Sequence, residues 1–264
     1  MTGHTIQSIP RRLRTSAWVL AAIVWLASLI VTPISLWIGG QPTFPVLASL
    51  GVLAQLLTVL LALAKSWPIS RIAWTAALVF FLCLGIELLG ISSGLPFGSY
   101  GYSPRLQPQL GGVPVLIPLA WLMMLLPAWG ISAAILLPVY KRLGKLYWPT
   151  FALIAGLAFT AWDLYLDPQM TAHNLWTWTE PGGYFGIPWK NYLGWLISSS
   201  LLTLFIRPEK LPLLPLAVVY TLTWAFQAIG LGLFWGQPGP ALAGFAGMGL
   251  FTCLAWVQLR RGDV

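Results

Sequence analysis

Apolar stretches of about 20 residues recur along this chain, and their length constrains the fold more than any other feature. As a helix, such a stretch crosses a hydrocarbon core of about 30 Å. Hydrophobic residues make up 58% of the 264 positions and charged residues only 8%, which is too little polar surface for a soluble protein. We therefore predict an all-α polytopic membrane bundle of about eight helices, with residues 1–264 as a single integral membrane domain. The expected spans are 16–38, 43–65, 69–91, 114–138, 147–166, 190–206, 213–235 and 239–257.

The basic residues predict which links are cytoplasmic, because cytoplasmic loops of membrane proteins collect Lys and Arg. Only Arg105 and Lys190 fall in links on the opposite side. We therefore expect both termini to be cytoplasmic, with short tails 1–15 and 258–264, in a protein of the cell membrane. The net charge of +8 follows from this asymmetry and favours no nucleic-acid partner. The other basic residues all fall on the predicted cytoplasmic side: Arg11, Arg12, Arg14, Lys65, Arg71, Lys141, Arg142, Lys145, Arg207, Lys210, Arg260 and Arg261.

Two links on the predicted non-cytoplasmic side, 92–113 and 167–189, are long and rich in Gly, Pro and aromatic residues. Functional residues concentrate in long loops held by a rigid scaffold, so we expect the site there. Cys83 and Cys253 fall inside expected spans without a CxxC pattern, which favours packing roles over a disulfide or a metal site.

Two acidic residues lie at the same depth in the predicted bundle. Glu87 follows Arg71 by 16 residues and Asp163 follows Lys145 by 18. At about 1.5 Å per helical residue, both lie roughly 24–27 Å from the cytoplasmic boundary, in the outer third of the membrane. Asp167 follows Asp163 by one helical turn on the same face.

Carboxyls at membrane depth are costly, and they normally face the bundle interior and serve a site. A carboxyl buried without a cation is favoured in its protonated form, which can donate a proton in general acid catalysis. Glu87, Asp163 and Asp167 are therefore candidate catalytic residues. Structural roles remain as alternatives: Glu87 and Asp163 could hydrogen-bond Trp or Tyr, and Asp167 could terminate its helix, which we expect Pro168 to end.

Aromatic residues are concentrated next to these acids. Nine of the 34 positions in 162–195 are aromatic, against 14% for the whole chain. An interfacial belt of Trp and Tyr accounts for part of this enrichment. Ring faces around acids would also stabilise a developing cation, so the combination indicates carbocation chemistry. The nine are Trp162, Tyr165, Trp176, Trp178, Tyr184, Phe185, Trp189, Tyr192 and Trp195.

Four sequence blocks carry a resemblance to a known family: "GIELLGISSGLPFGSYGYSP", "VPVLIPLAWLMM", "AWDLYLDPQM" and "GGYFGIPWKNYLGW". Together, over about 85–195, they resemble the carotenoid 1′,2′-hydratases, integral membrane proteins of carotenoid biosynthesis. The resemblance implies addition of water across the terminal C1′=C2′ double bond of a ψ end group, giving a tertiary alcohol. Lycopene, γ-carotene or a C50 relative would be the substrate. The motif positions that carry over, without assigned roles, are Glu87, Tyr100, Tyr102, Asp163, Asp167 and Asn191.

The resemblance also bears on partners and mechanism. It implies no cofactor and no metal, a carotenoid substrate within the bilayer, and other enzymes of carotenoid biosynthesis as candidate partners. We expect Asp163 or Glu87 to protonate the alkene, Asn191 or a second carboxylate such as Asp167 to order the attacking water, and that carboxylate to take the proton of the water. The expected substrate-binding residues are Tyr100, Tyr102, Trp162, Trp178, Tyr184, Asn191 and Trp195.

Two other functions fit parts of the pattern. The D-x3-D spacing of Asp163 and Asp167 could hold Mg²⁺ and diphosphate in an intramembrane prenyltransferase, although the sequence has no second aspartate-rich motif. Glu87 and Asp163 could instead be relay sites of a proton-coupled carrier, although no internal repeat is evident.

Overall fold

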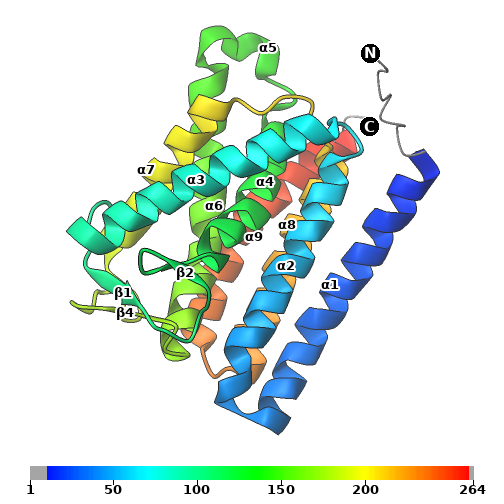
Figure 1. Ribbon diagram of the computed structural model, residues 1–264. Coiled ribbons are helices and arrows are strands. Elements are labelled where there is room, and N and C mark those ends of the chain that lie inside the picture. Colours follow the sequence, from blue (N-terminus) through cyan, green and yellow to red (C-terminus); the bar gives the residue numbers. More distant parts are fainter. Residues whose placement is uncertain (1–10, 262–264) are drawn as a thin grey trace, which may run out of the picture.

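The computed structural model describes residues 11–261, and within them it is a bundle of eight long helices, as the sequence predicts. Figure 1 shows these helices with small strands at one end of the bundle. The predicted tails lie partly outside the described residues, and α1 and α9 cover the remainder. The long helices are α1 (Arg11–Gly39), α2 (Phe44–Leu63), α3 (Ile69–Ser93), α4 (Leu116–Leu136), α6 (Tyr147–Ala172), α7 (Trp189–Ile206), α8 (Leu213–Ile229) and α9 (Pro238–Arg261).

Short elements connect the long helices. A single turn of helix, α5 (Tyr140–Leu143), and the 3₁₀ turn η2 (Gly144–Leu146) join α4 to α6. Another 3₁₀ turn, η1 (Gln41–Thr43), joins α1 to α2, and the π-helical turn η3 (Gly230–Phe234) extends α8.

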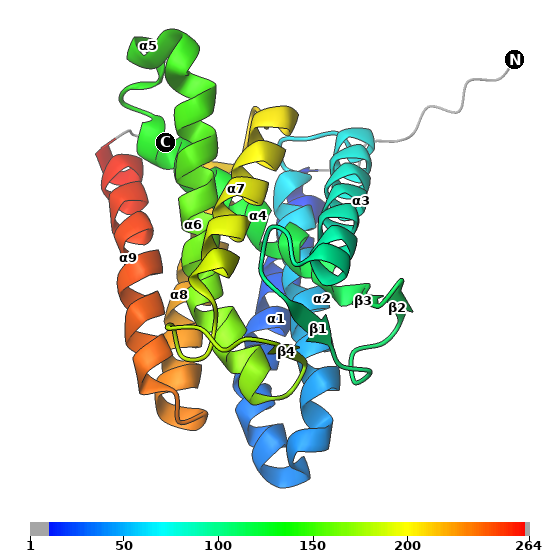
Figure 2. The same ribbon diagram turned by 90° about the vertical axis from the view of Figure 1, so that its left-hand side faces the viewer.

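Seven helical segments within the described residues are long and apolar enough to cross a membrane. The exception among the eight long helices is α7, whose 18 residues include Lys190, Asn191 and three consecutive serines. α7 lies between α3 and α6 (Figure 2), and most of its polar residues are buried there, among them Asn191, Ser198 and Ser199, whereas Lys190 at its first turn is exposed.

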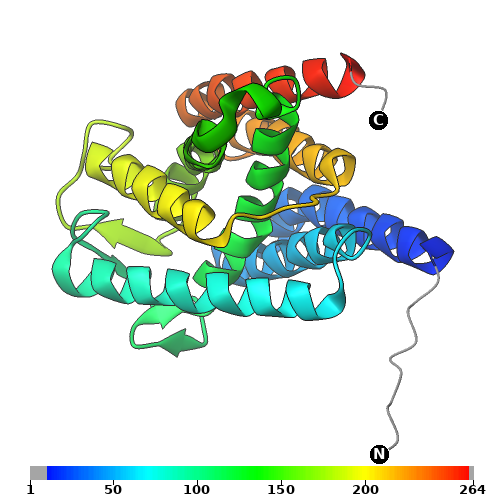
Figure 3. The same cartoon turned by 90° about the horizontal axis from the view of Figure 1, so that it is seen from above.

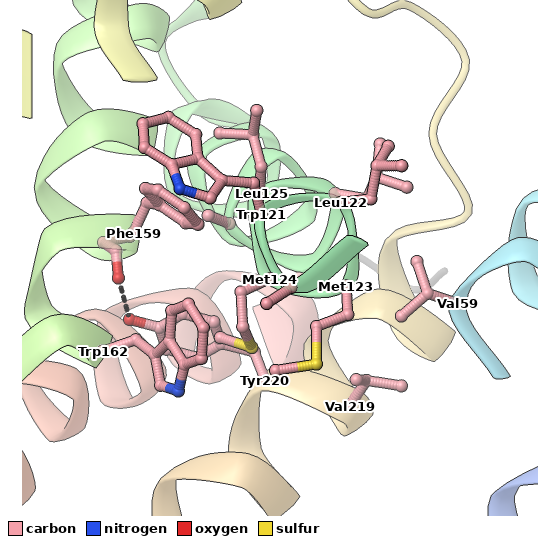
Figure 4. Packing of buried hydrophobic residues seen from close by; sticks show 14 of the residues in the cluster. Val59, Trp121, Leu122, Met123, Met124, Leu125, Phe159, Trp162, Val219 and Tyr220 are labelled. Carbon is pink, nitrogen blue, oxygen red and sulfur yellow. Dashed lines mark hydrogen bonds between the residues drawn. The ribbon is translucent and has the colours of Figure 1, made fainter. Parts of the chain in front are cut away.

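α4 forms the centre of the bundle. Viewed from above, α7 lies on one side of it and α1, α2 and α8 on the other, and α3 crosses one end of it (Figure 3). Most of α4 is buried, and its Met124 and Trp121 side chains pack against α6 and α8 as shown in Figure 4. α1 lies at the edge and packs mainly on α2. The bundle therefore has a buried aromatic core on the α6 side and a loosely covered side at α1.

The two long outer links pair with each other. β1 (Tyr100–Tyr102) runs antiparallel to β4 (Trp176–Trp178), with Tyr100 opposite Trp178 and Tyr102 opposite Trp176. A second small pair, β2 (Gln109–Leu110) and β3 (Val113–Pro114), lies in the first link. Because alternate residues of a strand share a face, the two tyrosines and the two tryptophans project together. The pairing joins segments that are more than 70 residues apart in the sequence.

The prediction that Pro168 ends its helix is wrong, because α6 continues to Ala172. A proline inside a helix leaves the carbonyl four residues earlier without its N–H donor. Here that carbonyl belongs to Leu164, and the Tyr184 hydroxyl donates to it at 2.9 Å. With the freed carbonyl satisfied, the helix can continue. Asp167 is therefore a helical residue and does not terminate α6.

Candidate active site

Glu87 is the acid at the outer end of α3, and only 2% of it is exposed. Its Oε2 accepts hydrogen bonds from Tyr100 at 2.5 Å and Tyr102 at 2.8 Å. Burial and the neighbouring Glu87 raise the pKa of both tyrosines above the usual value, so their hydroxyls stay protonated and donate. Two hydroxyl donors thus converge on one oxygen of Glu87.

Gly90 leaves the space in which the Tyr100 hydroxyl reaches Glu87. It lies three residues after Glu87 on α3, and a Cβ added there would lie 2.6 Å from the Tyr100 hydroxyl oxygen. Any side chain at position 90 would therefore displace Tyr100 from Glu87. Sequence reasoning missed Gly90; the only signal for it was its spacing within "GIELLG".

The second acidic group joins α6 to α7. Asp163 and Asp167 lie one turn apart, and both are buried. The Asn191 amide nitrogen donates to Asp163 Oδ2 at 2.8 Å and also to Asp167 Oδ2. Trp176 Nε1 donates to Asp167 Oδ1 at 3.0 Å. One amide thus bridges two carboxyls, and Asp167 accepts from two N–H groups.

One cavity of about 130 Å³ connects the two acidic groups. Glu87, Asp167 and Asn191 line it, together with both tyrosines of β1. Its wall is otherwise largely apolar, so a hydrocarbon end group could occupy it next to two carboxyls.

Aromatic rings form the inner wall of this cavity. Trp121 and Trp195 stack with ring centroids 4.9 Å apart, and Trp162 lies 6.0 Å from Trp195. Figure 4 shows Trp121 and Trp162 on either side of Phe159, whose ring is 5.0 Å from both Trp121 and Trp195. Such ring faces can stabilise a cation.

The structure brings most of the predicted site residues together. Eight of the ten line the cavity: Glu87, Asp167, Tyr100, Tyr102, Trp162, Trp178, Asn191 and Trp195. Asp163 lies behind Asp167 and does not line it, and Tyr184 supports α6 through Leu164 instead. Trp121 and Trp176 were not predicted as site residues. The signal for Trp176 was its position two residues before Trp178, on the same face of a strand.

His173 follows α6 directly and is 5% exposed. Its ring stacks on Phe44 with centroids 3.6 Å apart, and its backbone carbonyl accepts a hydrogen bond from Arg105 at 2.6 Å. Burial, and secondarily the charge of Arg105, lower the pKa of His173 from 6.5 to about 4. The histidine is therefore neutral at ordinary pH and helps to fix the outer end of α2 against α6.

This lowered pKa predicts acid sensitivity. Between about pH 6.5 and pH 4 the unfolded chain binds a proton on His173 that the folded chain does not, so folding stability falls as the pH drops through this window. His173→Phe keeps an aromatic ring on Phe44 and removes the titration. In detergent, the unfolding temperature should fall less for the variant than for the unchanged protein between about pH 7 and pH 4. Equal decreases would contradict this role for His173.

The prenyltransferase alternative needs a metal-binding group of side chains. Among residues 11–261, no group of three His, Cys, Asp or Glu is arranged to hold a metal ion. Instead, the Asn191 amide donates hydrogen bonds to both carboxyls of the D-x3-D pair, and the Trp176 indole donates another to Asp167.

Comparison with known proteins agrees with the family resemblance that four sequence blocks carry. The family model for carotenoid biosynthesis proteins matches residues 46–251. A bisanhydrobacterioruberin hydratase of Haloarcula japonica is 36% identical over 122 residues, which are 46% of this chain and 39% of that relative. The match thus spans well under half the length of the relative. No solved structure matches the chain. The family match covers most of the bundle and all of the acidic site, and the chain belongs to the carotenoid biosynthesis protein family.

Proposed function

We propose that this protein is a carotenoid hydratase that adds water across the terminal C1′=C2′ double bond of a ψ end group. The observation that carries the proposal is a largely apolar cavity that is lined by two carboxyls, Glu87 and Asp167, and by aromatic rings. Hydration of an alkene needs a proton donor, a stabilised cation and a base for the water, and this cavity offers all three. The similarity to bisanhydrobacterioruberin hydratase supports the same reaction class.

Glu87 is the proposed acid. Glu87 lines the cavity and its Oε2 accepts from the two tyrosine hydroxyls, so we assign the transferable proton to Oε1. The O–H bond breaks as a C–H bond forms at C2′, the less substituted carbon. The positive charge develops at C1′, which bears two methyl groups.

The aromatic wall holds the cation in place. The stacked Trp121 and Trp195 rings and the nearby Trp162 present π faces to the cavity, which attract positive charge and exclude water from side reactions. A tertiary cation beside these rings can persist until the ordered water adds to it.

Asp167 is the proposed base. Trp176 donates to its Oδ1 and Asn191 to its Oδ2, so both oxygens accept hydrogen bonds, as in a carboxylate, whereas both donors to Glu87 act on one oxygen. Water adds to C1′ as its proton passes to Asp167, giving the tertiary 1′-hydroxy product. The cycle closes when this proton returns across the cavity to Glu87. Asp163 is a positioning residue that shares the Asn191 amide with Asp167.

We further infer that the protein lies in the cell membrane with this cavity near the non-cytoplasmic face. Lys65, Arg142 and Arg207 lie in links at one end of the bundle, whereas Arg105 and Lys190 lie at the end that holds β1 and β4. Excess positive charge marks the cytoplasmic end.

The proposal is tested by pigment analysis. A carotenoid-free bacterial host would make lycopene, γ-carotene or bisanhydrobacterioruberin in separate strains, each with and without this gene. Chromatography and mass spectrometry should reveal, in at least one strain, a more polar product heavier by the mass of one water. If none of the three is hydrated while the protein is present in the membrane, the proposal is wrong.

A further inference from the structure

A second cavity, of about 230 Å³, adjoins the one at the acidic site. Four residues line both cavities: Leu29 of α1, Gln55 of α2, Gln227 of α8 and Trp235. Because the two cavities share a wall on three helices, they meet at this level of the bundle.

The first cavity extends along one face of α2. Phe44, Ala48, Gly51 and Gln55 line it, and they recur at the three- and four-residue spacing of a single helix face. From Phe44 to Gln55 this face measures roughly 16 Å at about 1.5 Å per residue. The cavity is therefore elongated, and it leads from the acidic site toward the second cavity.

The second cavity reaches the surface of the bundle between α1 and the end of α8. Its lining includes Ile30, Ile34 and Phe234, which are 53%, 49% and 60% exposed. α1 packs mainly on α2 and leaves the α8 side thinly covered, as its position at the edge in Figure 1 shows. In a membrane-spanning bundle, these exposed apolar side chains face lipid.

We propose that the two cavities form one lateral passage that holds the polyene of the substrate, with its far end leaving between α1 and α8 into the bilayer. The inference rests on the proposed function and extends it, since it assigns a binding site to the part of the substrate that does not react. The end group lies at Glu87 and Asp167, and the chain passes Gly51 and the junction at Gln55.

The chemistry of the passage suits a long hydrocarbon. A polyene that enters from the side stays in a largely apolar environment, so no apolar surface is exposed to water on binding. At the junction, the Gln55 amide nitrogen is satisfied, since it lies 3.1 Å from Met124 Sδ and 3.2 Å from Thr223 Oγ1. Among the described residues, Gln227 Oε1 and Trp235 Nε1 at the same junction have no hydrogen-bond partner, so these two polar atoms interrupt an otherwise apolar path.

Gly51 offers a direct test. It lines the first cavity, and a Cβ added there would meet no atom within 4 Å. The Cβ of Gly51→Phe is thus accommodated, and we expect its ring to reduce the space in the passage. Gly85→Phe is the matched control, because Gly85 also lies in a helix, has the same open space and is exposed on α3 away from both cavities.

The first measurement is conversion of whichever carotenoid the unchanged protein hydrates. We expect Gly51→Phe to lower hydrated product by about tenfold or more, equivalent to about 1.4 kcal/mol, and Gly85→Phe to leave it unchanged. Both variants should be present in the membrane in equal amounts and unfold at the same temperature. Normal conversion by Gly51→Phe would overturn the passage, whereas a lack of hydrated product from the unchanged protein would overturn the proposed function.

The second measurement needs no turnover. Carotenoid retained by purified protein is quantified by its absorbance in three variants: Glu87→Gln alone, and Glu87→Gln combined with Gly51→Phe or with Gly85→Phe. We expect the Gly51→Phe combination to retain about tenfold less carotenoid than the other two. Equal retention in all three would place the polyene elsewhere and overturn the inference.

Discussion

Glu87→Gln is expected to lower hydrated product by about 10²- to 10⁴-fold, the usual contribution of a general acid. Glutamine keeps the size of the side chain and an oxygen that can accept from Tyr100 and Tyr102, whose hydroxyls donate to Glu87 Oε2. It has no carboxyl proton to give to the alkene. The measurement is product per unit of membrane protein in the strain whose carotenoid the unchanged protein hydrates.

A matched control separates this loss from a general effect of removing an acid. Glu209→Gln makes the same chemical change at an exposed position in the link between α7 and α8. Glu209 does not line the cavity. This variant should leave product formation unchanged. Near-normal hydration by Glu87→Gln would instead assign the acid role to another carboxyl.

Asp167→Asn is expected to cause a loss of similar size, about 10²-fold or more, because it removes the proposed base for the water. Asp163→Asn should cost only about tenfold, since Asp163 does not line the cavity and acts through the shared Asn191 amide. Because Asp163 and Asp167 share a donor, Asp163→Asn should also shift the pH profile of hydration. Equal losses for the two variants, with no shift in the profile, would show that Asp163 does not act by positioning Asp167.

The sequence predicted the bundle and the acids because both signals are local. Eight apolar runs indicate eight helices, and a carboxyl inside such a run has few structural uses. The pairing of Asp163 with Asp167 followed from helical periodicity alone. The depth argument also placed Glu87 level with Asp163, and the structure brings Glu87 and Asp167 to the same cavity.

The contacts that sequence reasoning missed depend on tertiary structure. The helix passes Pro168 because Tyr184, in a separate segment, satisfies the freed carbonyl of Leu164, and no local rule indicates that partner. The position of Trp176 on Asp167 likewise depends on the pairing of β1 with β4. Asp163 lies on the same helix face as Asp167 and is buried without lining the cavity, and its contact with Asn191 depends on the packing of α7 on α6.

The β1–β4 pair also bears on when the protein becomes competent during its synthesis. Glu87 and the two tyrosines lie before the α5 turn, whereas Asp167, Asn191 and Trp176 lie after it. Neither portion alone carries both the proposed acid and the proposed base. During synthesis, a chain that has inserted only its first four long helices therefore lacks Asp167, Asn191 and Trp176. Under the proposed function, hydration requires α7 to insert and β4 to pair with β1, so we expect a truncated chain that ends before α7 to hydrate no carotenoid.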